Sequence, residues 1–173
     1  NKTTALNGLA LVKHLKGQEK EALKISKEAY NTISNIDDAT LIQQTKERYI
    51  QALIWNNSFK KAETLIDAII KERPNENWIL ALRATLNIYK SDFKKSVSDY
   101  NRILENDSTS FDGNLGKANA LKALGYYDDA YQSANITLSF YENQKDATNF
   151  IKNLNTTFTP SLETKASYSF DNG

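Results

Sequence analysis

Apolar residues recur three or four positions apart over most of the chain, which is the spacing of one face of an α-helix. Ile66, Ile69 and Ile70 have this spacing, and it returns 34 residues later at Tyr100, Ile103 and Leu104. Polar residues fill the positions between them. The pattern therefore predicts an all-α chain made of consecutive amphipathic helices.

Four similar blocks interrupt this pattern, and each reads as a sharp turn followed by the start of a helix. The blocks that begin at Asn57, Ser91 and Gly125 are 34 residues apart, and the block at Gly17 lies 40 residues before Asn57, one period plus six. Each block ends on a small side chain, which allows two helices to approach within about 8 to 10 Å. These small residues are Ala22, Ala62, Ser96 and Ala130. We expect paired helices, with the six extra residues between Ser34 and Thr40.

The blocks and their period resemble tetratricopeptide repeats (TPR). The resemblance covers most of the sequence, although the Trp, Leu and Gly usual in the first helix of such repeats are largely replaced. It places repeats near residues 3–36, 43–76, 77–110 and 111–144, with a capping helix at about 145–154. It implies an all-α fold: a right-handed alpha-alpha superhelix of about four helix pairs, occupying residues 1–155.

The last residues, 156–173, have a different pattern, because Ala166 to Phe170 alternates apolar and polar residues as a strand does. Two interpretations are open: a tail, or the start of a following β domain. The second is similar to outer-membrane proteins in which a periplasmic TPR segment precedes a β-barrel. The Asn- and Lys-rich composition also resembles that of Bacteroidetes envelope proteins. Both similarities favour the periplasm or cell envelope over the cytoplasm.

Composition excludes much of the usual active-site chemistry. The chain has 22 basic and 21 acidic residues, so its net charge of +1 gives no field that would attract nucleic acid or an anionic membrane. Cysteine is absent, and His14 is the only histidine. The pairs at Asp37 and Asp128 precede or begin predicted helices, where carboxylates stabilise exposed N–H groups. We therefore predict no enzyme, no cofactor, no metal site, no nucleic-acid partner and no direct membrane insertion by this segment.

A protein or peptide segment is the partner that the resemblance implies, held in a concave groove lined by the first helix of each repeat. Trp55 and Trp78 have a second interpretation, as core residues between neighbouring repeats. The basic clamp by which some TPR domains hold acidic chaperone tails is absent, since the equivalent positions are Leu11, Glu47 and Leu82. The predicted function is a non-catalytic protein-protein interaction scaffold; the alternative is a periplasmic TPR module of a larger outer-membrane or polysaccharide-export or assembly protein. The predicted groove residues are Gln44, Glu47, Gln51, Trp55, Trp78, Thr85, Tyr89, Asn119 and Lys122, with Ala81, Asp112 and Leu115 beside them.

Overall fold

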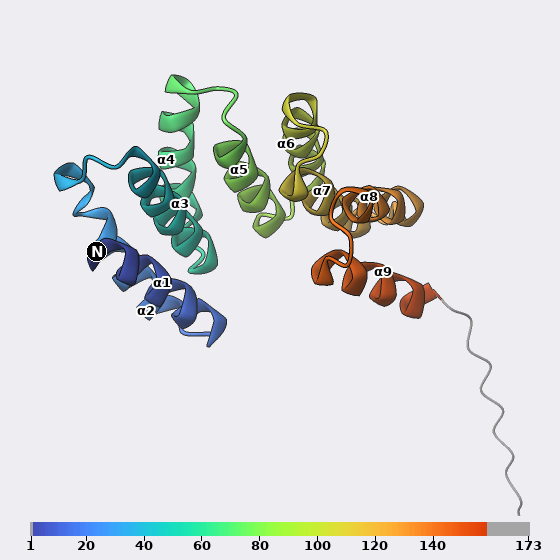
Figure 1. Ribbon diagram of the computed structural model, residues 1–173, viewed down its shortest axis with the longest axis horizontal. Helices are drawn as coiled ribbons and strands as arrows, with labels where there is room; N and C mark the ends of the chain where they lie inside the picture. Colours follow the sequence, from blue (N-terminus) through green and yellow to red (C-terminus); the bar gives the residue numbers. More distant parts are fainter. Residues whose placement is uncertain (1, 159–173) are drawn as a thin grey trace, which may run out of the picture.

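The computed structural model describes residues 2–158, and within them every regular element is a helix. Four pairs of α-helices follow one another, and a ninth helix closes the series (Figure 1). The bounds are α1 (Lys2–Leu15), α2 (Glu19–Tyr30), the short 3-10 helix η1 (Ile33–Asn35), α3 (Ala39–Trp55), α4 (Phe59–Glu72), α5 (Asn77–Tyr89), α6 (Phe93–Asn106), α7 (Phe111–Ala123), α8 (Tyr127–Phe140) and α9 (Lys145–Phe158). The predicted all-α fold is confirmed for this part of the chain.

The helix pairs stand side by side along an arc (Figure 1). The first helices of successive pairs touch one another, α1 with α3, α3 with α5 and α5 with α7. Successive second helices make at most marginal contact. The stack is therefore tighter along its first helices, and these line its concave side.

The turn inside each pair has the same backbone conformation. Gly17, Asn57, Ser91 and Gly125 all have a positive φ, between 56° and 81°. At the third turn, the N–H of Ser91 donates to the carbonyl of Ile88 (2.9 Å) and the next N–H donates to that of Asn87 (2.8 Å). This pair of bonds is the Schellman motif, which satisfies the last carbonyls of a helix. The blocks that punctuate the sequence are thus four copies of one helix-ending turn.

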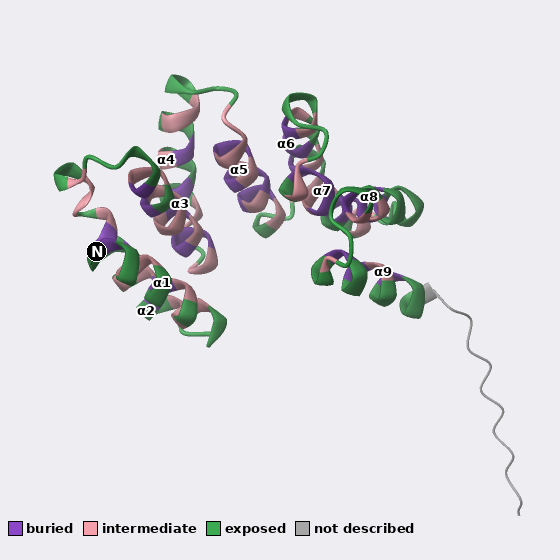
Figure 2. Cartoon of the chain, viewed as in Figure 1, coloured by how far each residue is buried: buried purple, intermediate pink, exposed green. Residues whose placement is uncertain are grey.

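The small residues predicted to let helices cross are all fully buried: Ala22, Ala62, Ser96 and Ala130 each have an exposure of 0%. Larger apolar side chains pack around Ala62 and Ala130 in clusters that together extend from α2 to α9, while the outer surfaces stay exposed (Figure 2). Each pair contributes to the core of the next. The repeats consequently cannot bury their apolar faces singly.

The two departures from a regular stack lie between the first two pairs and at the last helix. The extra residues form η1 and a short loop, and Asp38 ends the loop by accepting a hydrogen bond from the N–H of Leu41 (3.1 Å). At the other end, Ala147, Phe150 and Leu154 bury one face of α9 on the core of α7 and α8. This helix includes residues 155–158, which extends it beyond the predicted capping helix. The strand-like stretch, Ala166 to Phe170, lies outside the described residues.

Candidate functional site

A cavity of about 250 Å³ opens between α3, α5 and α7, the first helices of three successive pairs. Five of the nine predicted groove residues line it: Glu47, Gln51, Trp78, Thr85 and Asn119. The other lining residues are Ala81, Leu82, Tyr100, Phe111, Asp112, Leu115 and Gly116. Residues that are up to 72 positions apart in sequence thus share one space.

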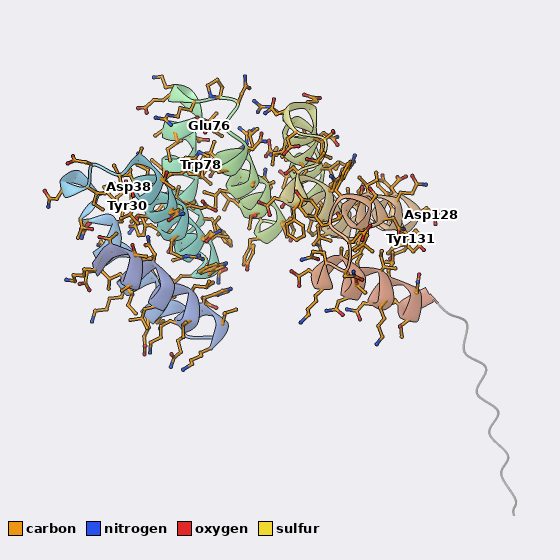
Figure 3. The ribbon with its side chains drawn as sticks, viewed as in Figure 1. Tyr30, Asp38, Glu76, Trp78, Asp128 and Tyr131 are labelled. Atoms are coloured by element: carbon orange, nitrogen blue, oxygen red, sulfur yellow. The ribbon has the colours of Figure 1, made fainter. Side chains whose placement is uncertain are left out.

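Trp78 forms part of the cavity wall and also packs on the core. Its ring lies against the cluster of buried side chains around Leu82, and its indole N–H donates to the carboxylate of Glu76 (3.2 Å) at the start of α5 (Figure 3). The side chain is half-buried. The structure therefore joins the two interpretations of this residue, because one face of the ring supports the core and the residue still borders the cavity.

The floor of the cavity comes from a second helix. Tyr100 belongs to α6 and is only 5% exposed, yet it lines the cavity between α5 and α7. Its ring fits because residue 116 is glycine: a Cβ there would lie 2.3 Å from Tyr100 Cζ. Burial raises the pKa of the phenol, and a hydrogen bond with the Thr85 side chain opposes that rise. The hydroxyl is thus held at the base of the groove.

Two carboxylates face this space from opposite sides of α5, Glu47 on α3 and Asp112 on α7. Within residues 2–158 neither forms an ion pair. Burial raises the pKa of both groups, and the negative charge of Asp112 raises that of Glu47 further. Arg48 lowers the pKa of Glu47, but by less than burial raises it. Glu47 is half-buried and Asp112 is exposed at the cavity, and the two acids lie close enough for the charge of Asp112 to act on Glu47.

Trp55 packs against the first repeat. The ring of His14 on α1 stacks on it with a centroid separation of 3.6 Å and an interplanar angle of 4°. His14 Nδ1 lies 2.9 Å from a carboxylate oxygen of Glu19, and the guanidinium of Arg48 lies 5.8 Å from the Trp55 ring. The only histidine is therefore engaged in holding the first two pairs together.

The remaining predicted residues lie on the same helices but outside the lining of the cavity. Tyr89 ends α5 and is 44% exposed; burial and the nearby Glu19 raise its pKa. Lys122 on α7 places its Nζ 5.5 Å from the centre of the Phe150 ring of α9. Gln44 is exposed near the start of α3. These residues extend the candidate surface along the first helices toward both ends of the stack.

Sequence reasoning missed four lining residues, Leu82, Tyr100, Phe111 and Gly116. Tyr100 was missed because it belongs to α6, the second helix of its pair, whereas the prediction assigned groove residues only to first helices. Gly116 carried a usable signal, because glycine costs about 1 kcal/mol in a helix interior relative to alanine and so indicates a close contact.

The chemistry available in this cavity is that of recognition by packing and hydrogen bonding. Its lining combines aromatic and aliphatic walls with amide, hydroxyl and carboxylate groups. Across the described part of the chain, no three histidine, aspartate or glutamate side chains gather as a metal ion would require. None of the helices between residues 2 and 158 is both long and apolar enough to cross a bilayer.

The architecture is the TPR fold, a solenoid of helix pairs, as comparison with solved structures shows. A thermophilic TPR protein from Thermus thermophilus matches with a TM-score of 0.71 and 12% identity, over 90% of this chain and 82% of that one. A tetratricopeptide repeat protein from Parabacteroides merdae matches with a TM-score of 0.62 and 21% identity, over 89% of this chain and 58% of that one. MamA from Desulfovibrio magneticus matches with a TM-score of 0.58 and 13% identity, over 91% and 85%. No protein-family model and no curated protein matches the sequence.

Proposed function

We propose that this protein is a non-catalytic scaffold that holds a segment of a partner protein in its concave groove. The observation that carries the proposal is the cavity between α3, α5 and α7, because three consecutive repeats contribute to it. Its aromatic walls beside polar side chains suit recognition of a polypeptide, in which large amphipathic rings supply most of the binding energy. Solenoids of this kind commonly bind on such concave surfaces.

A non-catalytic role is also supported by the use made of the titratable groups. His14, the only histidine, stacks on Trp55 and pairs with Glu19, which leaves it poorly placed to act as a general base in the cavity. The partner-binding surface that we propose comprises the cavity residues together with Gln44, Trp55, Tyr89 and Lys122.

The proposal is tested with a library of short random peptides displayed on phage and selected against the immobilised chain. Asn119 is exposed on the groove side of α7, and its amide bonds only to the carbonyl of Leu115 in its own helix (3.0 Å). The substitution Asn119→Trp should fill the cavity and abolish binding of the selected peptides. Asn101→Trp makes the same change at an exposed position of α6, on the outer layer, and should leave binding unchanged.

Circular dichroism should show the same helicity for both variants. Peptides that bind Asn119→Trp as well as the unmodified chain, or that are lost only with Asn101→Trp, would place the binding surface elsewhere. Failure to select any peptide would also count against the proposal.

A second candidate is a module of a larger envelope protein that takes part in outer-membrane assembly or polysaccharide export. It is favoured by the strand-like alternation of Ala166 to Phe170, which lies outside the described residues. Sequencing the complete gene tests it: continuation into an apolar-polar alternating region would support it, and an in-frame stop directly after Gly173 would remove it.

A further inference from the structure

The cavity between α3, α5 and α7 has an unusual balance of charge. Its lining contains the carboxylates of Glu47 and Asp112 and no lysine, arginine or histidine. The nearest cation in sequence, Arg48, lies over the Trp55 ring and donates to Gln51 Oε1 (2.8 Å), toward the first repeat. On α7, Lys122 lies over Phe150 of the capping helix. Neither Arg48 nor Lys122 belongs to the lining of the cavity, although Gln51, to which Arg48 donates, does.

We infer that this cavity receives a positively charged side chain, Lys or Arg, of the partner segment. The inference rests on the proposed function, since it identifies what the groove recognises. Charge complementarity carries it: a cation between Glu47 and Asp112 replaces their mutual repulsion with two attractive interactions. A half-buried acid such as Glu47 that forms no ion pair in the fold costs stability, and such costs gather at binding sites.

The shape of the cavity agrees with this occupant. A volume of about 250 Å³ corresponds to roughly eight water molecules at about 30 Å³ each, which is enough for the five to seven heavy atoms of one such side chain. Trp78 and Phe111 provide apolar walls for the methylene groups, and an aromatic face attracts a cation directly. A Lys or Arg side chain would therefore find both an apolar passage and an acidic end.

The raised pKa values of the two acids add support from the protein itself. Burial disfavours the charged form of each group, and a bound cation would favour it. Binding of a Lys or Arg peptide should accordingly lower the pKa of both carboxylates.

The test uses sublibraries of short random peptides, acetylated and amidated so that no terminal charge contributes, each with one residue type at the central position. We expect the Lys and Arg sublibraries to bind roughly tenfold more tightly than the Met sublibrary, as one charge-assisted contact predicts. The double substitution Glu47→Gln and Asp112→Asn should remove this preference, so that the Lys, Arg and Met sublibraries bind the variant with equal affinity.

The matched control is the double substitution Glu105→Gln and Asp129→Asn, which removes the same charge from exposed positions of α6 and α8 and should keep the preference. Equal binding of the Lys, Arg and Met sublibraries, all of it lost in Asn119→Trp, would overturn the cation inference and leave the groove proposal standing. Binding that survives Asn119→Trp would overturn the groove proposal itself. A Lys and Arg preference lost equally in both double variants would also overturn the inference, because it would then reflect net charge.

Discussion

Replacing Gly116 with alanine tests how the floor of the groove is built. In a helix interior alanine is favoured over glycine by about 1 kcal/mol, so this change would normally stabilise the chain. At Gly116, however, the new Cβ would lie 2.3 Å from Cζ and 2.4 Å from Cε1 of Tyr100. Both contacts are with a ring that is 5% exposed and has little room to move.

The magnitude follows from setting these two effects against each other. Overpacking of a core costs about 1 to 3 kcal/mol, and a contact of 2.3 Å with a buried ring belongs toward the upper end of this range. After the helix preference is subtracted, we expect a net destabilisation of roughly 1 to 2 kcal/mol. For a chain of this size, this lowers the melting temperature by about 2 to 8 °C.

Gly8 provides the matched control. It lies inside α1, and nothing would lie within 4 Å of a Cβ added there. Gly8→Ala should therefore raise the melting temperature by about 2 to 4 °C. Thermal denaturation followed by circular dichroism compares the two variants directly.

A second comparison separates the ring contact from other effects of the substitution. In a Tyr100→Leu background the ring is absent, so adding Gly116→Ala should cost less than it does in the unmodified chain. The reasoning would be refuted if Gly116→Ala proved as stabilising as Gly8→Ala, or if its cost were unchanged without the ring.

Three further predictions concern other parts of the structure. Ser91 has a φ of 60°, a conformation that costs a residue other than glycine about 1 to 2 kcal/mol. Part of this cost is offset by the greater entropy that glycine loses on folding, so Ser91→Gly should stabilise the chain by roughly 0.5 to 1 kcal/mol, as measured by urea denaturation. A loss of stability would contradict the turn geometry. The pKa values of Glu47 and Asp112 are higher in the folded chain than in the unfolded chain. As the pH falls from 7 toward about 4.3, the folded chain therefore takes up protons at these groups before the unfolded chain does. Stability from these groups should therefore rise over this range, and the double variant Glu47→Gln and Asp112→Asn should be more stable than the unmodified chain at pH 7 by a margin that shrinks on acidification; a margin that grows would oppose it. Arg83 binds the buried carboxylate of Asp99 through its Nε (3.0 Å), so Arg83→Met should cost about 3 to 5 kcal/mol. A second change, Asp99→Leu, should recover part of the loss, because it removes the unpaired charge but also the acceptor of the Asn87 amide (3.2 Å); an equal loss in both variants would show that the ion pair is not the cause.

The helix pairs were predictable from the sequence because their cause is local and periodic. A turn residue followed five positions later by a small side chain recurs with the period of the fold, and both features act within one pair of helices. The positive φ values at Asn57 and Ser91 show that the turn tolerates residues other than glycine, which is why spacing was a better guide than residue type.

The cavity was only partly predictable, because its lining residues come from three helix pairs and are brought together by the way these pairs stack. Glu47 and Asp112 belong to repeats that are not neighbours, and no sequence pattern states that they share a space. Tyr100 enters from the outer layer through the gap left at Gly116. Trp55 on α3 stacks on His14 on α1, a contact between two repeats that no pattern in the sequence states.

The most direct test of a partner-binding groove on the first helices is NMR with a peptide from the phage selection that carries a spin label. The account predicts strong broadening of the signals of Ala81 and Thr85 in the groove. It also predicts that Tyr131, exposed on the outer helix α8, is unaffected (Figure 3). Broadening of Tyr131 with no change at Ala81 and Thr85 would contradict it.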